Sequence, residues 1–131
     1  MYREVESIEA YSSQLSKILP LRLKEYEGLD MKSKYAAERL VQLISDAEME
    51  IVVLIYRATE PRPSGDVETM LEALSGKFTK EIVQNIKDLR KLRNALVHAY
   101  STSNYDKEVF GMATKLKNIG KFIESAKRAM G

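Results

Sequence analysis

The chain has 131 residues, of which 44% are hydrophobic and 31% are charged, so we expect one globular domain over residues 1–131. Its 21 basic and 19 acidic residues nearly cancel to a net charge of +2, so a nucleic-acid partner requires local clustering of cations. The absence of cysteine excludes disulfides, thiolate metal sites and cysteine nucleophiles.

No segment has the apolar length that a membrane span needs. The longest apolar run, residues 51–56, is far shorter than the roughly 20 residues required. The N-terminal residues include acids and no apolar segment, which argues against a signal peptide. We therefore expect a cytoplasmic protein with no membrane partner.

Three features organise the first half of the chain. A helical pattern covers residues 5–23, with Pro20 as an interruption and Gly28 at its end. The strongest pattern covers residues 36–58, and its apolar arc is wide enough for a helix at the centre of a bundle. This pattern stops before residues 60–65, whose prolines and glycine indicate a loop.

The second half continues the helical pattern. A short helix is expected over residues 66–75, and Thr79 opens a fourth helix. Residues 101–104 break the periodicity, and Ser103 and Asp106 have capping-box spacing for a fifth helix that continues to the C-terminus. Strand-like alternation is absent. The sequence predicts an all-α, up-and-down bundle of four long helices and one short helix.

One cation stands in the apolar row of the fourth helix, where Arg93 occupies a position at which a hydrophobic residue is expected. A buried guanidinium is costly unless it is paired or lies at an interface. Arg93 is therefore either an edge residue with a buried stem and a solvated head, or it points into a cleft or across a dimer seam. Glu50 is a candidate acidic partner for it, whereas Asp46 and Glu48 are expected to face solvent.

His98 is the single histidine and the leading candidate for acid–base chemistry. The commoner role for such a histidine near a helix end is a surface or capping group. At about 100° per residue, Arg93 and Tyr100 share a helix face, whereas His98 lies roughly 140° from Arg93. Two explanations are open: the helix breaks near His98, or the two groups meet their counterparts across a two-fold axis.

A run of cations precedes His98. Its members are Lys87, Arg90, Lys91 and Arg93. Only one acid, Asp88, lies among them. Single-stranded RNA binds where such cations adjoin aromatic rings, and Tyr100 and Tyr105 are candidate rings for base stacking. The alternative is a solvated helix face whose charges complement the helix dipole.

The segment RNALVHAY, from Arg93 to Tyr100, resembles the R-x4-H-x-Y signature of the HEPN superfamily, specifically its HepT-like toxin branch. The likeness covers about residues 33–131. It includes the central segment AAERLVQLISDAEMEIVVLIY and the segment YDKEVF that begins the last helix, whereas the first helix matches only in kind.

The resemblance implies a HEPN-like domain that dimerises so that two motifs face each other in one cleft. It implies metal-independent, cofactor-free endoribonuclease activity, with Arg93 on the scissile phosphate, His98 as general acid or base, and Asn94 in support of the motif. Tyr100 matches the position that a partner minimal nucleotidyltransferase AMPylates. The implied function is the toxin of a type VII toxin–antitoxin pair, with RNA as substrate and the nucleotidyltransferase as antitoxin.

Two alternatives remain at this point. The first is a non-catalytic HEPN dimer that binds RNA or a nucleotide, or that docks a nucleotidyltransferase. It arises because phosphodiester cleavage normally uses two acid–base groups and the chain has one histidine, which a dimer would double. The second is a purely structural bundle in which Arg93 pairs with Glu50 and His98 caps a helix.

Overall fold

The computed structural model describes residues 1–98 and 105–131, and these residues form helices and no strands. In chain order the elements are α1 (Tyr2–Ile18), α2 (Leu23–Glu27), α3 (Met31–Thr59), α4 (Val67–Ala73), α5 (Lys80–Val97), α6 (Asp106–Lys115), the 3-10 turn η2 (Leu116–Asn118) and α7 (Ile119–Met130). The predicted all-α class is confirmed. Among the described helices, none combines the length and apolarity that crossing a membrane requires.

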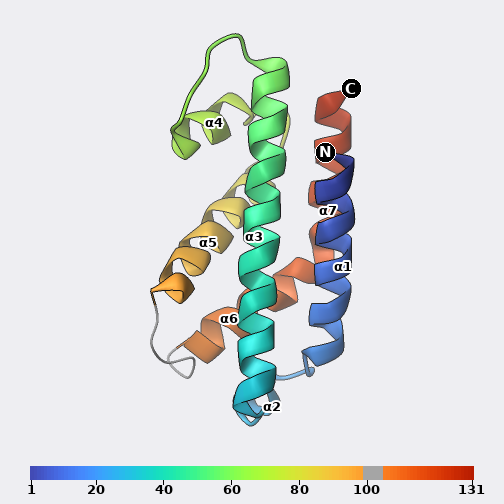
Figure 1. The fold of residues 1–131 in the computed structure, drawn as a ribbon, viewed down its shortest axis with the longest axis vertical. Helices are drawn as coiled ribbons and strands as arrows, with labels where there is room; N and C mark the ends of the chain where they lie inside the picture. The colour runs from blue at the N-terminus through green and yellow to red at the C-terminus, as the bar shows by residue number, and fades with distance from the viewer. Residues whose placement is uncertain (99–104) are drawn as a thin grey trace.

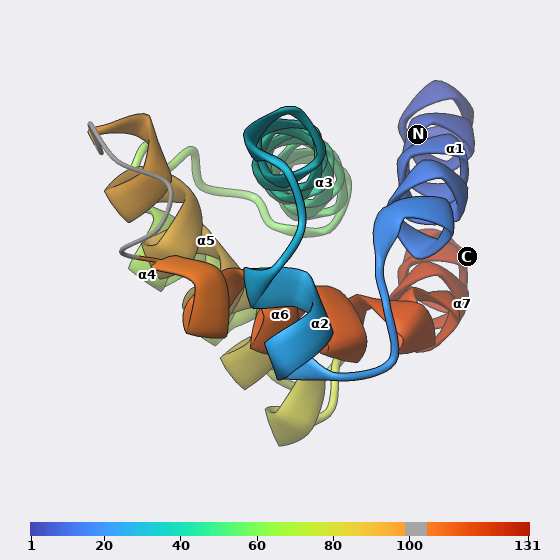
Figure 2. The same cartoon turned by 90° about the horizontal axis from the view of Figure 1, so that it is seen from below.

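The 29-residue helix α3 lies at the centre of the bundle, as the width of its apolar arc predicts. Helix α1 runs antiparallel beside it, and α5 and α7 stand on opposite sides of it (Figures 1 and 2). Helices α2 and α6 contact each other near the end of the bundle where α3 begins, and α4 packs near its other end (Figure 1). The long helices alternate in direction, so the bundle is up-and-down.

Two clusters of buried side chains form the core, one towards each end of α3. One cluster joins Ile51 and Ile55 to the stacked rings of Phe78 and Phe122, whose centroids lie 5.7 Å apart. The other lies around Ile44 of α3 and includes residues of α1, α2, α5 and α6. Each fully buried apolar side chain contributes roughly 1.5–3 kcal/mol, so these clusters hold α5 and α7 against α3.

Side-chain caps begin three of the helices. The side chains of Asp30, Asp66 and Thr79 each accept a hydrogen bond from the backbone N–H three residues further on. Such a cap contributes about 1 kcal/mol. Thr79 therefore opens α5, as predicted from the sequence.

The predicted interruption at Pro20 is confirmed. Helix α1 ends at Ile18 because Pro20 forces the preceding Leu19 into an extended conformation. A separate short helix, α2, follows and ends at Gly28. The bundle therefore has two short helices, α2 and α4, among its described residues.

The expected continuous last helix is instead divided into α6, η2 and α7. The division is the turn η2, which ends at Asn118, and Gly120 follows in the first turn of α7; both residues have low helix propensity. Helix α6 begins at Asp106 with Tyr105 as its N-cap residue, and Ser103, the predicted cap, lies outside the described residues.

Candidate functional site

Helix α5 positions the Arg93–His98 motif. Its buried leucines Leu89, Leu92 and Leu96 hold it against α3. The helix ends at Val97, and His98 is its C-cap residue, with φ −99° and ψ 2° and a backbone N–H bond to the carbonyl of Ala95 at 3.2 Å. His98 is exposed. The helix therefore breaks at His98, as the first of the two explanations requires, and the described residues show no contact between His98 and Arg93.

Arg93 reaches from α5 to the central helix. Its Nε donates a hydrogen bond to Oδ1 of Asp46 at 2.9 Å, and the two side chains are 33% and 43% exposed, respectively. Its Nη1 also donates to Oδ1 of Asn94 at 3.4 Å. A guanidinium has five N–H donors, so three have no partner among the described residues. The Arg93 side chain is therefore part-exposed, and its guanidinium group keeps N–H donors with which it can bind an oxyanion.

Glu50, the candidate acidic partner of Arg93, is exposed and makes no ion pair within the described chain. Asp46, one helical turn earlier, pairs with Arg93 in its place. The two acids are four residues apart and share a face of α3, so the sequence pattern does not distinguish them. The height at which α5 crosses α3 selects Asp46. The sequence predicts that Asp46 and Glu48 both face solvent. In the structure Asp46 is part-exposed and pairs with Arg93, whereas Glu48 is buried.

The cationic run of α5 lines a hollow of about 370 Å³ between α4 and α5. Lys87, Arg90 and Lys91, three of the predicted RNA contacts, border this hollow together with Asn94 of the motif. The structure thus brings the predicted cations and one motif residue onto a single surface, which we call the α4–α5 hollow. Asn94 brings the hollow next to Arg93 in the sequence of α5, but Arg93 itself does not line it.

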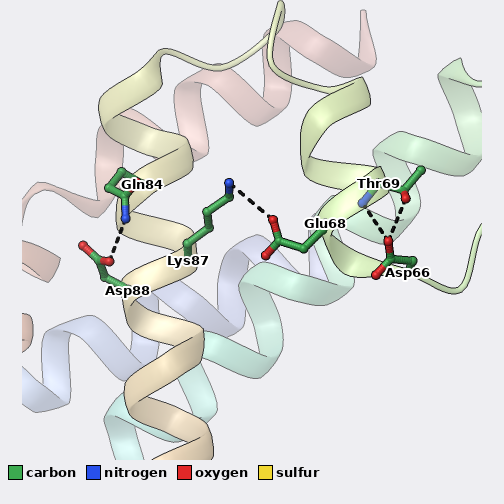
Figure 3. A network of polar contacts seen from close by, with 6 residues as sticks. All are labelled: Asp66, Glu68, Thr69, Gln84, Lys87 and Asp88. Atoms are coloured by element: carbon green, nitrogen blue, oxygen red, sulfur yellow. Dashed lines mark hydrogen bonds and ion pairs between the residues drawn. The ribbon is translucent and has the colours of Figure 1, made fainter.

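Acidic side chains partly neutralise the α4–α5 hollow (Figure 3). Lys87 Nζ lies 3.4 Å from Oε2 of Glu68 on α4, and Gln84 Nε2 donates to Oδ1 of Asp88 at 2.9 Å. The sequence does not identify Glu68 as a partner of Lys87, because no local pattern shows that α4 folds back beside α5. An exposed pair of this kind contributes about 0–1 kcal/mol, so it can yield to a phosphate.

Tyr100 and Tyr105 are the two predicted stacking rings, and the structure describes only Tyr105. Tyr105 is half-buried and packs against the core cluster around Leu89, Leu92 and Val109, so much of its ring is already covered by protein. Tyr100, the predicted modification site, lies outside the described residues.

A second polar cluster lies away from the motif, where α2, α3 and α6 meet. Lys34 Nζ is 2.8 Å from Oδ2 of Asp106, and both side chains are buried, as are Glu38 and Tyr26. Burial, reinforced by the Asp106 carboxylate, raises the pKa of Glu38 to about 7. Across the described residues no three histidine or carboxylate side chains are placed to share a metal ion, so this cluster is an ion pair with a buried acid beside it.

The described chain is thus an all-α protein with an arginine and an exposed histidine at the end of one helix, beside a cationic hollow. The all-α bundle is consistent with the HEPN class that the motif resembles. The family model described as Ribonuclease HepT-like matches residues 8–126. The chain therefore belongs to the HepT-like ribonuclease family. Comparisons with curated proteins and with solved structures found no significant match.

Proposed function

We propose that this protein is an endoribonuclease toxin that acts as a homodimer and cleaves RNA at its R-x4-H motif without a metal ion. The observation that carries the proposal is that α5 ends with both motif side chains accessible: Arg93 is part-exposed and His98, five residues later, is exposed. The α4–α5 hollow beside them and the membership of the ribonuclease family support it.

The chemistry assigned to the motif is an attack of a ribose 2′-hydroxyl on the adjacent phosphorus, with departure of the 5′-oxygen. His98 takes the hydroxyl proton or protonates the leaving oxygen, since imidazole exchanges protons near neutral pH. Arg93 binds the non-bridging oxygens and stabilises the charge that develops on them. To do so it exchanges Asp46 for the phosphate, which costs little because the pair is half-exposed.

The homodimer follows from the number of acid–base groups. Cleavage by this route uses a base and an acid, and the chain has one histidine. Two protomers that face each other would supply two imidazoles and two guanidinium groups to one cleft. The end of α5 is open to such an approach, since Asn94, Val97 and His98 are all exposed.

We further propose that a minimal nucleotidyltransferase acts as the antitoxin and AMPylates Tyr100. The phenol lies two residues after His98 in the chain. A nucleotide attached there would add phosphate charge next to the motif, and RNA would be repelled by this charge and excluded by the bulk of the nucleotide. The test is whole-protein mass spectrometry after co-expression with the nucleotidyltransferase, comparing the wild type with Tyr100→Phe.

An RNA cleavage assay on the purified protein tests the catalytic proposal. His98→Ala and Arg93→Ala are each expected to lower the rate by about 100-fold or more. Lys117→Ala, which removes an exposed cation of η2, is the matched control and is expected to stay within about twofold. Activity of wild type is expected to survive excess chelator. Equal rates for His98→Ala and wild type would contradict the assigned role.

Mixed dimers separate the composite site from a site within one protomer. When equal amounts of wild-type and His98→Ala chains are unfolded together and refolded, about half of the dimers are mixed and carry one imidazole. A composite site that needs two imidazoles predicts about a quarter of the activity of the same amount of wild type, whereas a site within one protomer predicts about half. RNA binding without cleavage in every sample would instead indicate the non-catalytic HEPN dimer.

A further inference from the structure

Glu48 is a buried acid that the Arg93–His98 motif does not use. It lies near the middle of α3, two residues after Asp46, so the two side chains point about 200° apart around the helix. Only 5% of Glu48 is exposed. Among the described residues no hydrogen-bond donor or cation pairs with its carboxyl group, and burial raises its pKa to about 8. A buried carboxyl group without a partner destabilises the fold, so its presence points to a function other than stability.

A cavity of about 350 Å³ adjoins Glu48. It lies between the first half of α5 and the segment that runs through α6, η2 and α7, and α3 contributes Glu48 to its wall. The volume is that of a small-ligand site and exceeds the space that one water molecule occupies.

The lining of the cavity combines apolar walls with one deep acid. Side chains such as Ile82, Met112 and Phe122 form the apolar part. Ser125, which is also buried, adds a hydroxyl group to the wall. A ligand that fits must therefore present an apolar body and one group that satisfies a carboxylate.

The charged groups at the mouth of the cavity are exposed and carry one excess positive charge. Three exposed cations and two exposed acids border it: Lys115, Lys121, Arg128, Glu81 and Glu124. Exposed charges are screened by water and select weakly between ligands, whereas a buried charge selects strongly. Glu48 is the buried acid of the lining, and its ionised form favours a cationic ligand.

We propose that this cavity binds a small organic cation, a primary amine on an apolar chain or ring, with the Glu48 carboxylate as its counter-ion. The ammonium group would replace the partner that Glu48 lacks, and the apolar body would lie against Ile82, Met112 and Phe122. This site is separate from the Arg93–His98 motif and does not depend on the ribonuclease proposal.

Ion-pair formation with an amine requires the ionised form of Glu48, although the free protein holds this group protonated at neutral pH. An ammonium ligand that binds at pH 7 therefore displaces the carboxyl proton, which is released to the buffer. The release of about one proton per ligand is a signature that non-specific adsorption of an amine does not share.

Isothermal titration calorimetry of the full chain with hexylamine and 2-phenylethylamine at pH 7 tests the proposal, with hexan-1-ol as the neutral control. We expect saturable binding of one amine per chain, at least about tenfold tighter than the alcohol. In two buffers with different ionisation enthalpies, the measured heats should differ by the release of about one proton.

Glu48→Gln is expected to weaken amine binding by at least about tenfold and to remove the dependence on buffer. Glu50→Gln, a change to an exposed acid of the same helix, is the matched control and should bind like the wild type. The proposal is overturned if wild type shows no saturable binding of either amine or if the alcohol binds as well. Neither outcome needs a variant, so the test does not depend on how well Glu48→Gln folds.

Discussion

Two ion pairs of α3 can be compared directly. One connects α3 to α6, which follows the motif in the chain, and the other connects α3 to α5, which carries the motif. Lys34 pairs with Asp106 at the start of α6, and Asp46 pairs with Arg93 near the end of α5. The N···O distances are nearly equal, 2.8 and 2.9 Å. Their burial differs: the first pair is 7% and 10% exposed, the second 33% and 43%.

This difference in exposure separates a structural pair from an exchangeable one. A buried charge that loses its partner has no water to replace it, so Lys34 and Asp106 must stay together. Arg93 can exchange Asp46 for water or for a phosphate at a cost of about 1 kcal/mol or less. The same chemistry thus anchors the beginning of α6 and leaves the motif arginine available for a ligand.

Removal of one member of the buried pair has the largest expected effect. Lys34→Met should lower the free energy of unfolding by roughly 3–5 kcal/mol, because it leaves Asp106 and Glu38 buried without a cation. Urea denaturation followed by circular dichroism measures the change. Lys32→Met, at an exposed position of the same helix, is the control and should stay within about 0.5 kcal/mol. A loss below about 1 kcal/mol for Lys34→Met would show that the buried pair contributes no more to stability than the exposed Arg93–Asp46 pair does.

Glu48 is a buried acid that has no partner among the described residues. Its replacement should therefore stabilise the fold. Its folded-state pKa, about 8, lies above the unfolded value of 4.5, so its contribution is fully present below pH 4.5 and is lost as the pH rises through 8. Glu48→Gln should therefore be more stable than wild type by roughly 2–4 kcal/mol at pH 7 and equal to it at pH 4. Urea melts at both pH values test this, with Glu50→Gln expected to match wild type throughout.

Glu38 adds a smaller pH dependence beside the buried pair. Burial and Asp106 raise its pKa to about 7 while Lys34 lowers it, so stability should fall as the pH rises from 4.5 through 7. Glu38→Gln should flatten this part of the stability curve, by less than Glu48→Gln does because Lys34 is nearby. Thermal melts from pH 4.5 to 8 measure both slopes, and unchanged slopes in Glu38→Gln would exclude it as the titrating group.

The exposed pair should give the smallest change in stability and a gain in RNA affinity. Asp46→Asn is expected to alter the free energy of unfolding by less than about 1 kcal/mol. It should tighten RNA binding roughly two- to fivefold, since it removes the anion that competes with phosphate for Arg93. Fluorescence anisotropy with a labelled RNA, in a His98→Ala background that prevents cleavage, measures the affinity. Glu50→Gln, which removes an acid that does not touch Arg93, is the control.

The sequence by itself determined the helical class, the central place of α3 and the location of the motif. These follow from local features: the spacing of apolar residues within one helix, the cap at Thr79 and the loop at residues 60–65. The same kind of evidence indicated that Arg93 stands in an apolar row, which agrees with its part-buried position, and it left open whether the helix breaks near His98, where the structure ends it.

Only the tertiary structure decided which charged residues meet. Arg93 pairs with Asp46 and not with Glu50, Lys34 pairs with Asp106, and Glu48 is buried next to a cavity. These partners are 47 and 72 residues apart in the chain, so their pairing depends on the height and angle at which helices cross. Periodicity within one helix assigns a face to a residue, but the neighbour opposite that face is set by packing between helices.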